Sequence, residues 1–158
     1  MSTYNKVLNV TDLTSQVQKV KAQNQKVVLC NGHFNVIHPG HLRFIQFAHQ
    51  QGDKLLIAVE GDSALLKQAP RQRFFNQVER ASSLAALQNV DLVIIIDEVS
   101  LNEVIDIVKP SVYVLGKEFE EERHEEIQQY IDCVTENNGK VVFGSGEVHY
   151  ASVDFLYQ

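Results

Sequence analysis

Apolar residues along the chain fall into two alternating patterns. Short runs of Val, Leu and Ile, typical of strands that are buried on both faces, occupy residues 26–30, 54–59, 92–96, 112–115 and 141–143. Between them, apolar side chains recur every three or four residues, as in amphipathic helices, over residues 40–51, 77–88, 101–108 and 121–137. One more such helix is predicted over residues 11–23, where Leu13, Val17 and Val20 form the apolar stripe.

Strands that alternate with helices of this length predict βαβ units. Such units pair their strands in parallel and place helices on the faces of the sheet. The chain is therefore predicted to have an α/β fold, with a Rossmann-like open parallel five-stranded sheet and helices on both faces. Right-handed crossovers put a ligand site at the carboxyl ends of the strands, near the point where the strand order reverses.

Composition narrows the class of protein. The 158 residues weigh 17.9 kDa, enough for one ordinary domain, and the 44% hydrophobic content supports a buried core. The 14 basic and 20 acidic residues give a net charge of −6, which argues against nucleic acid as a partner. Cys30 and Cys133 lack the spacing of a disulfide framework or a zinc site, and no apolar run is long enough for a membrane helix. We expect a cytoplasmic protein without membrane contact, in which residues 1–25 form an N-terminal helical extension and residues 26–158 form the main domain.

The segment after the first predicted strand contains the candidate chemistry. It reads Asn-Gly-His-Phe-Asn-Val-Ile-His-Pro-Gly-His over residues 31–41, and a helix is predicted to begin at its end. His38 and His41 lie three residues apart across the helix start, where imidazole N–H groups and the helix dipole favour an anion. Gly40 between them lets a phosphate approach the backbone closely. A lone histidine at a helix start is often only a cap or a surface residue, but two of them around a glycine favour a polyphosphate site.

This segment resembles the signature G-x-F-D-x-x-H-x-G-H of the cytidylyltransferase-like nucleotidylyltransferases. Within that group the chain is similar to the heptose-phosphate nucleotidylyltransferase domains that are fused to sugar kinases, and to glycerol-3-phosphate cytidylyltransferases. The likeness runs from about residue 26 to residue 156, with weaker matches at residues 52–55, 79–81, 90–91, 109–114 and 116–118. The resemblance implies that the chain is an enzyme of this class.

The implied reaction is transfer of a nucleoside monophosphate from CTP or ATP to a sugar phosphate or polyol phosphate, with release of pyrophosphate. Such a reaction depends on positioning and charge stabilisation rather than on a nucleophilic side chain. By the family's pattern, the catalytic residues are His38, His41, Lys67 and Arg80. The residues implied in nucleotide binding are Asn31, Gly32, His33, Phe34, Gly40, Arg71, Arg73, Gly116 and Ser152. Mg²⁺ is expected to arrive with the nucleotide and to need few protein ligands, so no metal site is predicted in the protein itself.

Several points of this comparison stay open at the level of sequence. Lys67, Arg71 and Arg73 are placed in a loop after the second strand, and either arginine matches the family's phosphate-binding arginine. The signature carries Asn35 where the family has Asp, and Leu115 stands where a Lys is usual. These departures keep a catalytically silent nucleotide-binding module as an alternative, beside an adenylyltransferase that acts on a cofactor precursor. The choice between CTP and ATP is open, with a slight preference for CTP.

Two expectations concern the assembly. The apolar stripe of the helix over residues 11–23 needs a covering surface, and related enzymes commonly pair, so a homodimer is expected. The alternative is that this helix folds back onto its own domain. The few residues after Leu156 leave little room for the family's final helix, so the chain is expected to be one domain of a longer protein that also carries a sugar kinase domain.

Overall fold

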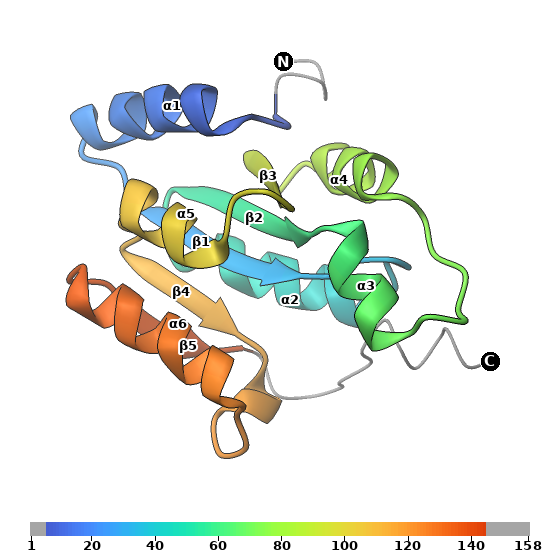
Figure 1. The fold of residues 1–158 in the computed structure, drawn as a ribbon. Coiled ribbons are helices and arrows are strands. Elements are labelled where there is room, and N and C mark those ends of the chain that lie inside the picture. The colour runs from blue at the N-terminus through green and yellow to red at the C-terminus, as the bar shows by residue number, and fades with distance from the viewer. Residues whose placement is uncertain (1–5, 145–158) are drawn as a thin grey trace.

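The computed structural model describes residues 6–144 and contains one five-stranded sheet (Figure 1). The strands are β1 (Val27–Gly32), β2 (Lys54–Glu60), β3 (Leu92–Ile96), β4 (Val112–Leu115) and β5 (Lys140–Phe143). Their order is β3-β2-β1-β4-β5, and each paired strand runs parallel to its neighbour. The predicted open parallel α/β sheet is confirmed.

Helices cover both faces of this sheet. They are α1 (Val10–Ala22), α2 (Pro39–His49), α3 (Asp62–Gln68), α4 (Gln77–Ala85), α5 (Leu101–Val108) and α6 (Glu125–Glu136), with a 3₁₀ turn, η2 (Lys117–Phe119). Buried residues of α1, α5 and α6 pack on one face, and those of α2 and α4 pack on the other. No helix in the described part of the chain has the length and apolarity to cross a membrane.

Two helices differ from the predicted pattern. α3 is absent from it because its seven residues bury only Leu65, which is too little to show a helical period. The predicted loop after β2 is therefore wrong in its first part, since Lys67 lies in the last turn of α3. α6 begins at Glu125 rather than at residue 121, because His124 is its N-cap and η2 and a turn occupy the residues before it.

The helix α1 folds back onto its own sheet. Its predicted apolar stripe is buried among residues of β1, β3 and α5, and Leu13 is completely buried. The backbone before α1 also pairs with the edge strand β3, where Leu8 N donates to Val93 O and Val93 N donates to Lys6 O, each at 2.8 Å. The expectation that this stripe needs the surface of a second chain is therefore wrong, because the chain covers the stripe itself.

The strand order reverses beside β1. From β1 the chain moves outward to β2 and β3, and then crosses to β4 and β5 on the other side. β1 leads into α2 on one face of the sheet, whereas β4 leads toward α6 on the opposite face. The two connections diverge at the carboxyl edge, and such a divergence opens the crevice in which α/β sheets bind ligands.

Candidate active site

Two histidines cap the helix that follows β1. His38 is the N-cap of α2, and its Nδ1 accepts a hydrogen bond of 3.0 Å from Gly40 N. His41, at the third helical position, accepts from His38 N through its own Nδ1 at 3.3 Å. The two ring centroids lie 3.9 Å apart. This is a capping box, built from histidines instead of the usual Ser or Thr and Glu, and it holds both rings at the N-terminus of α2.

The capping bonds decide which nitrogen of each ring carries the proton. Because Nδ1 accepts in both rings, the neutral form of each has its proton on Nε2. Burial, and then the charge of His38, lower the pKa of His41 to about 4, although a hydrogen bond with the Val36 backbone raises it. His41 is therefore neutral near pH 7 and brings no positive charge to this helix start.

The turn between β1 and the histidines is tightly constrained. Phe34 is buried and has a φ of 52°, a left-handed backbone conformation that is rare for a bulky residue. Its ring lies against Gly32, where an added Cβ would come within 2.9 Å of the ring, and its centroid is 5.5 Å from that of His41. Gly32 and Phe34 therefore shape this turn, and the Phe34 ring supports the His41 ring from one side.

Asn35 ties the signature segment to the loop before α4. Its side chain is almost fully buried, and its Oδ1 accepts a hydrogen bond of 2.7 Å from Phe75 N. An amide oxygen accepts this bond as a carboxylate oxygen would, and it places no negative charge beside the N-terminus of α2. The departure from the family's Asp therefore leaves a neutral side chain at this position, and its oxygen is used within the protein.

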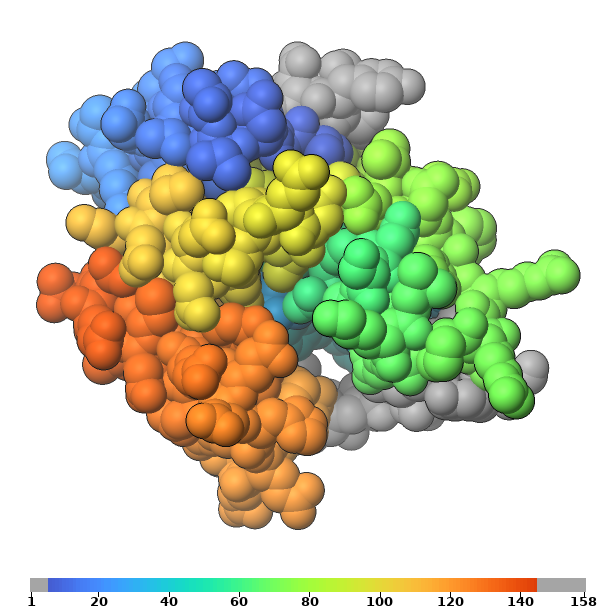
Figure 2. All heavy atoms as spheres, in the orientation of Figure 1, coloured from blue at the N-terminus to red at the C-terminus, as the bar shows by residue number. Residues whose placement is uncertain are grey.

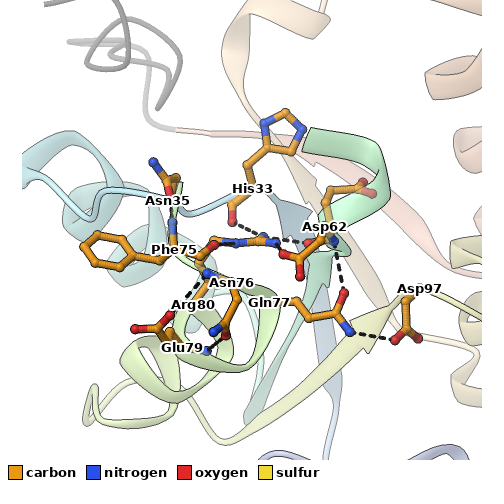
Figure 3. A network of polar contacts seen from close by, with 10 residues as sticks. His33, Asn35, Asp62, Phe75, Asn76, Gln77, Glu79, Arg80 and Asp97 are labelled. Atoms are coloured by element: carbon orange, nitrogen blue, oxygen red, sulfur yellow. Dashed lines mark hydrogen bonds and ion pairs between the residues drawn. The ribbon is translucent and has the colours of Figure 1, made fainter. Parts of the chain in front are cut away.

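Arg80 joins the ends of three segments from inside the protein (Figure 3). Its guanidinium is fully buried, with Nε donating to Phe75 O at 2.8 Å, and Nη1 donating to His33 O at 2.9 Å and to Glu60 O at 2.6 Å. Nη2 forms an ion pair of 2.9 Å with Asp62. The sequence places Arg80 at this edge of the sheet, but its donors are directed at protein groups. In this arrangement Arg80 holds the loops in place.

The contacts around Arg80 continue across the edge of the sheet. Gln77 accepts from Asp62 N at 3.0 Å and donates to Asp97, just beyond β3, at 2.8 Å (Figure 3). Burial, followed by the nearby charge of Arg80, lowers the pKa of His33, which favours its neutral form. The carboxyl ends of β1, β2 and β3 are thus connected through side chains of α4 and its N-terminal loop.

Three predicted cationic residues lie on the surface beside this network. Lys67 is exposed in the last turn of α3, and Arg71 and Arg73 are exposed in the segment between α3 and α4. Figure 1 shows α3 beyond the carboxyl end of β2, so these side chains belong to the same end of the molecule as the histidines. Nothing in their contacts distinguishes Arg71 from Arg73 as the family's phosphate-binding arginine.

The remaining predicted residues follow β1 and β4. Asn31 is half-buried near the end of β1, where its side chain contacts Tyr113 and Glu60. Gly116 follows β4, and an added Cβ there would lie 2.5 Å from the Glu118 carboxylate. Ser152 lies outside the described residues. Sequence reasoning missed Glu60 and Tyr113, although one signal was present: Asn31 and Glu60 interrupt otherwise apolar strands near their carboxyl ends.

Potential metal ligands are sparse in the described part of the chain. Within residues 6–144, no group of three or more His, Cys, Asp or Glu side chains is arranged to hold a metal ion. Asn35, at the family's Asp position, offers an amide oxygen that already accepts from Phe75 N. This donor set fits a small hard cation only if the ligands come mainly from elsewhere, such as phosphate oxygens and water.

Comparisons with known proteins place these features in a family. The model of the cytidylyltransferase-like family matches residues 29–144. The bifunctional protein HldE of Methylobacillus flagellatus is 32% identical over 119 residues, which cover 75% of this chain and 24% of that protein. HldE of Geotalea uraniireducens is 34% identical over 143 residues, covering 85% of this chain and 29% of that protein. The chain thus spans about a quarter of the length of these curated relatives.

Solved structures share the fold. A lipopolysaccharide core biosynthesis protein from Thermoplasma volcanium superposes with a TM-score of 0.64 at 23% identity, covering 78% of this chain and 99% of that one. A pantoate-beta-alanine ligase from Francisella tularensis gives 0.57 at 15% identity, covering 90% of this chain and 67% of that one. The family match spans most of the sheet, the histidine-capped α2 and the Arg80 network. The chain belongs to the cytidylyltransferase-like family of nucleotidylyltransferases.

Proposed function

We propose that this chain transfers a nucleoside monophosphate from CTP or ATP to a sugar phosphate or polyol phosphate. The observation that carries the proposal is the pair of histidines fixed at the N-terminus of α2, at the point where the sheet order reverses. Identity of about a third to HldE proteins supports a sugar phosphate as the acceptor. CTP is the slightly preferred donor.

The geometry suits in-line transfer at phosphorus. A phosphate oxygen of the acceptor attacks the α-phosphorus of the nucleotide, a new P–O bond forms, and the bond to the bridging oxygen breaks so that pyrophosphate leaves with the negative charge. The Nε2 side of His38 and His41 and the backbone amides of α2 would stabilise charge on the equatorial oxygens. The capping bonds hold both rings at this helix start before any ligand binds.

Surface cations are proposed to complete the phosphate site. Lys67, Arg71 and Arg73 would approach the triphosphate and the acceptor phosphate, since their long side chains are exposed at this end of the molecule. Gly40 would let a phosphate lie close to the backbone. Mg²⁺, bound through phosphate oxygens and water, would supply further positive charge to the triphosphate.

The wider context of the chain is also proposed. The curated HldE relatives are bifunctional and about four times as long as the matched region. We propose that this domain works beside a sugar kinase domain in the cytoplasm, because a kinase makes the phosphorylated acceptor that a nucleotidylyltransferase consumes.

A pyrophosphate-release screen tests the proposed function. CTP and ATP are each combined with heptose 1-phosphate and glycerol 3-phosphate in the presence of Mg²⁺. We expect release that depends on one acceptor and one nucleotide, and that falls by about 10²-fold in the His38→Asn variant. Nucleotide binding without release from any pair would instead identify a silent binding module, and release that requires a cofactor precursor as acceptor would identify the adenylyltransferase alternative.

A further inference from the structure

Two neighbouring strands change from apolar to polar at the same edge and on the same face of the sheet. In β1, Leu29 is followed two residues later by Asn31, and in β2, Ala58 is followed two residues later by Glu60. Leu29 and Ala58 belong to the buried cluster under α5 and α6, so the strand alternation directs Asn31 and Glu60 to that face as well. Both strands therefore carry a polar side chain near their carboxyl ends on this face, after buried apolar ones.

A chain of hydrogen bonds orients these two side chains. The hydroxyl of Tyr113, on the adjacent strand β4, donates to Asn31 Oδ1 at 2.6 Å. This bond settles the orientation of the amide, so its Nδ2 faces Glu60 Oε1, at the long distance of 3.5 Å. Tyr113 is completely buried and cannot turn away. The Glu60 carboxylate thus has the Asn31 amide N–H on one side, and the buried Tyr113 hydroxyl fixes the orientation of that amide.

The backbone of Glu60 is held by a hydrogen bond with the buried Arg80 side chain. Its carbonyl oxygen accepts the shortest hydrogen bond of the Arg80 guanidinium, at 2.6 Å. The carboxylate is half-buried, and burial raises its pKa, with the charge of Glu126 on α6 acting in the same direction and Asn31 and Arg80 opposing. Desolvation of this kind is costly for a carboxylate unless a ligand donates hydrogen bonds to it.

The position of Glu60 relative to the histidines of α2 suggests which part of a ligand would lie beside its carboxylate. His38 and His41 cap α2, which packs on one face of the sheet, whereas Asn31, Glu60 and Tyr113 point to the face covered by α5 and α6. Both groups lie toward the carboxyl edge, and Figure 2 shows a hollow in the surface between α3, α5 and α6, with the blue of the β1 region at its floor. A carboxylate repels phosphate, so this side of the crevice suits the uncharged part of a ligand whose phosphates lie at α2.

We propose that Glu60, oriented by Asn31 and Tyr113, forms a subsite that binds neighbouring hydroxyl groups of the ligand. A carboxylate accepts hydrogen bonds from two adjacent hydroxyls through its two oxygens, and the Asn31 amide adds a donor beside them. The chemistry is that of a vicinal diol, which both the ribose of the nucleotide and the polyol part of the acceptor carry. This inference rests on the proposed function.

The decisive variant is Glu60→Gln, which keeps the size of the side chain and removes its charge. We expect the KM of the substrate that carries the hydroxyls to rise tenfold or more, with a much smaller change in kcat. Tyr113→Phe, which keeps the ring and removes only the orienting hydroxyl, should raise the same KM by a few fold. Glu121→Gln is the matched control, because it removes the same single negative charge from an exposed residue. It should leave both KM values unchanged.

Substrates that lack a hydroxyl distinguish the two sources of the diol. If Glu60 binds ribose, 2′-deoxy or 3′-deoxy nucleotides should lose affinity with the unaltered protein and lose much less with Glu60→Gln, whose amide keeps one acceptor oxygen. If it binds the acceptor, the same pattern should appear between heptose 1-phosphate and its deoxy analogues. Thermal unfolding of each variant checks the fold, and Tyr113→Phe carries the test if Glu60→Gln is unstable.

The outcomes separate this inference from the proposed function. Pyrophosphate release by the unaltered protein, with both KM values unchanged in Glu60→Gln and Tyr113→Phe, would overturn the hydroxyl subsite and leave the proposed function intact. Failure of the unaltered protein to release pyrophosphate with any donor and acceptor would overturn the proposed function, and the inference with it.

Discussion

His38 and His41 each have two separable tasks. Nδ1 of each ring accepts a backbone hydrogen bond that caps α2, whereas Nε2 is the nitrogen that carries the proton in the neutral ring. Replacement by alanine removes both tasks together, and the loss of a cap alone costs about 1 kcal/mol of stability. A useful substitution must therefore preserve the capping bond.

Asn at position 38 and Gln at position 41 meet this requirement. Asn is a strong N-cap residue, and Gln at the third helical position completes a capping box, so His38→Asn and His41→Gln should leave thermal unfolding nearly unchanged. In both, the amide oxygen takes over the capping bond and an amide N–H group in a different position replaces the imidazole Nε2–H. Each should therefore lower kcat by about 10²-fold, the scale of a lost charge-stabilising donor. Pyrophosphate-release kinetics measure this effect. Near-normal kcat in both variants would mean that the histidines serve only as caps.

The lowered pKa of His41 predicts how stability depends on pH. In the unfolded chain this ring binds a proton below its ordinary pKa of 6.5, but in the folded chain it does so only near 4. The unfolded state therefore holds more protons between these values, so the free energy of unfolding should fall as the pH is lowered from 6.5 to 4, by at most about 1.4 kcal/mol per pKa unit. His33, whose pKa is also lowered, acts in the same direction.

Urea unfolding at several pH values tests this prediction. His41→Gln cannot titrate, so its stability should decline less between pH 6.5 and pH 4 than that of the unaltered protein. An identical decline in both proteins would show that His41 does not contribute to the pH dependence.

At the scale of elements, Arg80 is the residue that joins the loops of the site. Arg80→Met would leave the carbonyl oxygens of His33, Glu60 and Phe75 without the guanidinium in a buried region. Each buried group that loses its partner costs about 1–3 kcal/mol, so we expect a loss of about 3 kcal/mol or more. For a chain of this length the midpoint of thermal unfolding should fall by roughly 6–12 °C.

Arg73→Met is the matched control for stability, because it removes an exposed arginine from the same region. Circular dichroism should show little change in its unfolding midpoint. If Arg80→Met unfolded at the same temperature as the control, the network would not be stabilising. Contact with a ligand would then be the remaining role for Arg80.

At the scale of the whole molecule, α1 is part of the core of the sheet. Leu13 is completely buried beneath it, so Leu13→Ala should cost about 2–5 kcal/mol through lost burial and an incompletely filled cavity. Gln18→Ala, on the exposed side of the same helix, should have little effect. Urea unfolding measures both. Equal stability of the two variants would contradict the packing of α1.

The homodimer remains a prediction that α1 no longer supports. The apolar stripe of α1 is covered within the chain, and the β3 edge is paired in part with the backbone near Val7, so any dimer would have to use another surface. Light scattering at micromolar concentration, with and without nucleotide, should give twice the chain mass. A particle near 17.9 kDa under both conditions would rule the dimer out.

Much of the fold follows from periodicity along the chain. Runs such as residues 92–96 and 112–115 are buried on both faces, and that burial requires consecutive apolar residues, so the strands are visible in the sequence to within two residues. The helix α5 has four buried side chains at helical spacing and a Ser100 cap, and its bounds are predicted correctly. α3 has a single buried side chain, so no period reveals it.

The candidate site likewise has a part that local sequence predicts and a part that depends on contacts between distant residues. The spacing of His38, Gly40 and His41 is a local property, because three residues across a helix start lie together in any fold that forms that helix. The role of Arg80 is not local: its partners are 5, 18, 20 and 47 residues away, and an exposed arginine and a buried one look alike in a sequence. Sequence therefore identified the histidines, whereas only the folded chain shows what Arg80 holds.

What the sequence determined by itself is the five strands, every helix except α3, and the histidine pair, since each depends on neighbours within a few turns of chain. The alternation of strands and helices also implied the parallel sheet. Tertiary structure alone decided that α1 covers its own sheet, that Arg80 is buried, and that Tyr113 orients Asn31 toward Glu60. The bond between Tyr113 and Asn31 joins residues 82 positions apart, and the longest bond of Arg80 spans 47 positions. Local preference carries no information about such pairs, because their formation depends on the packing of the whole sheet.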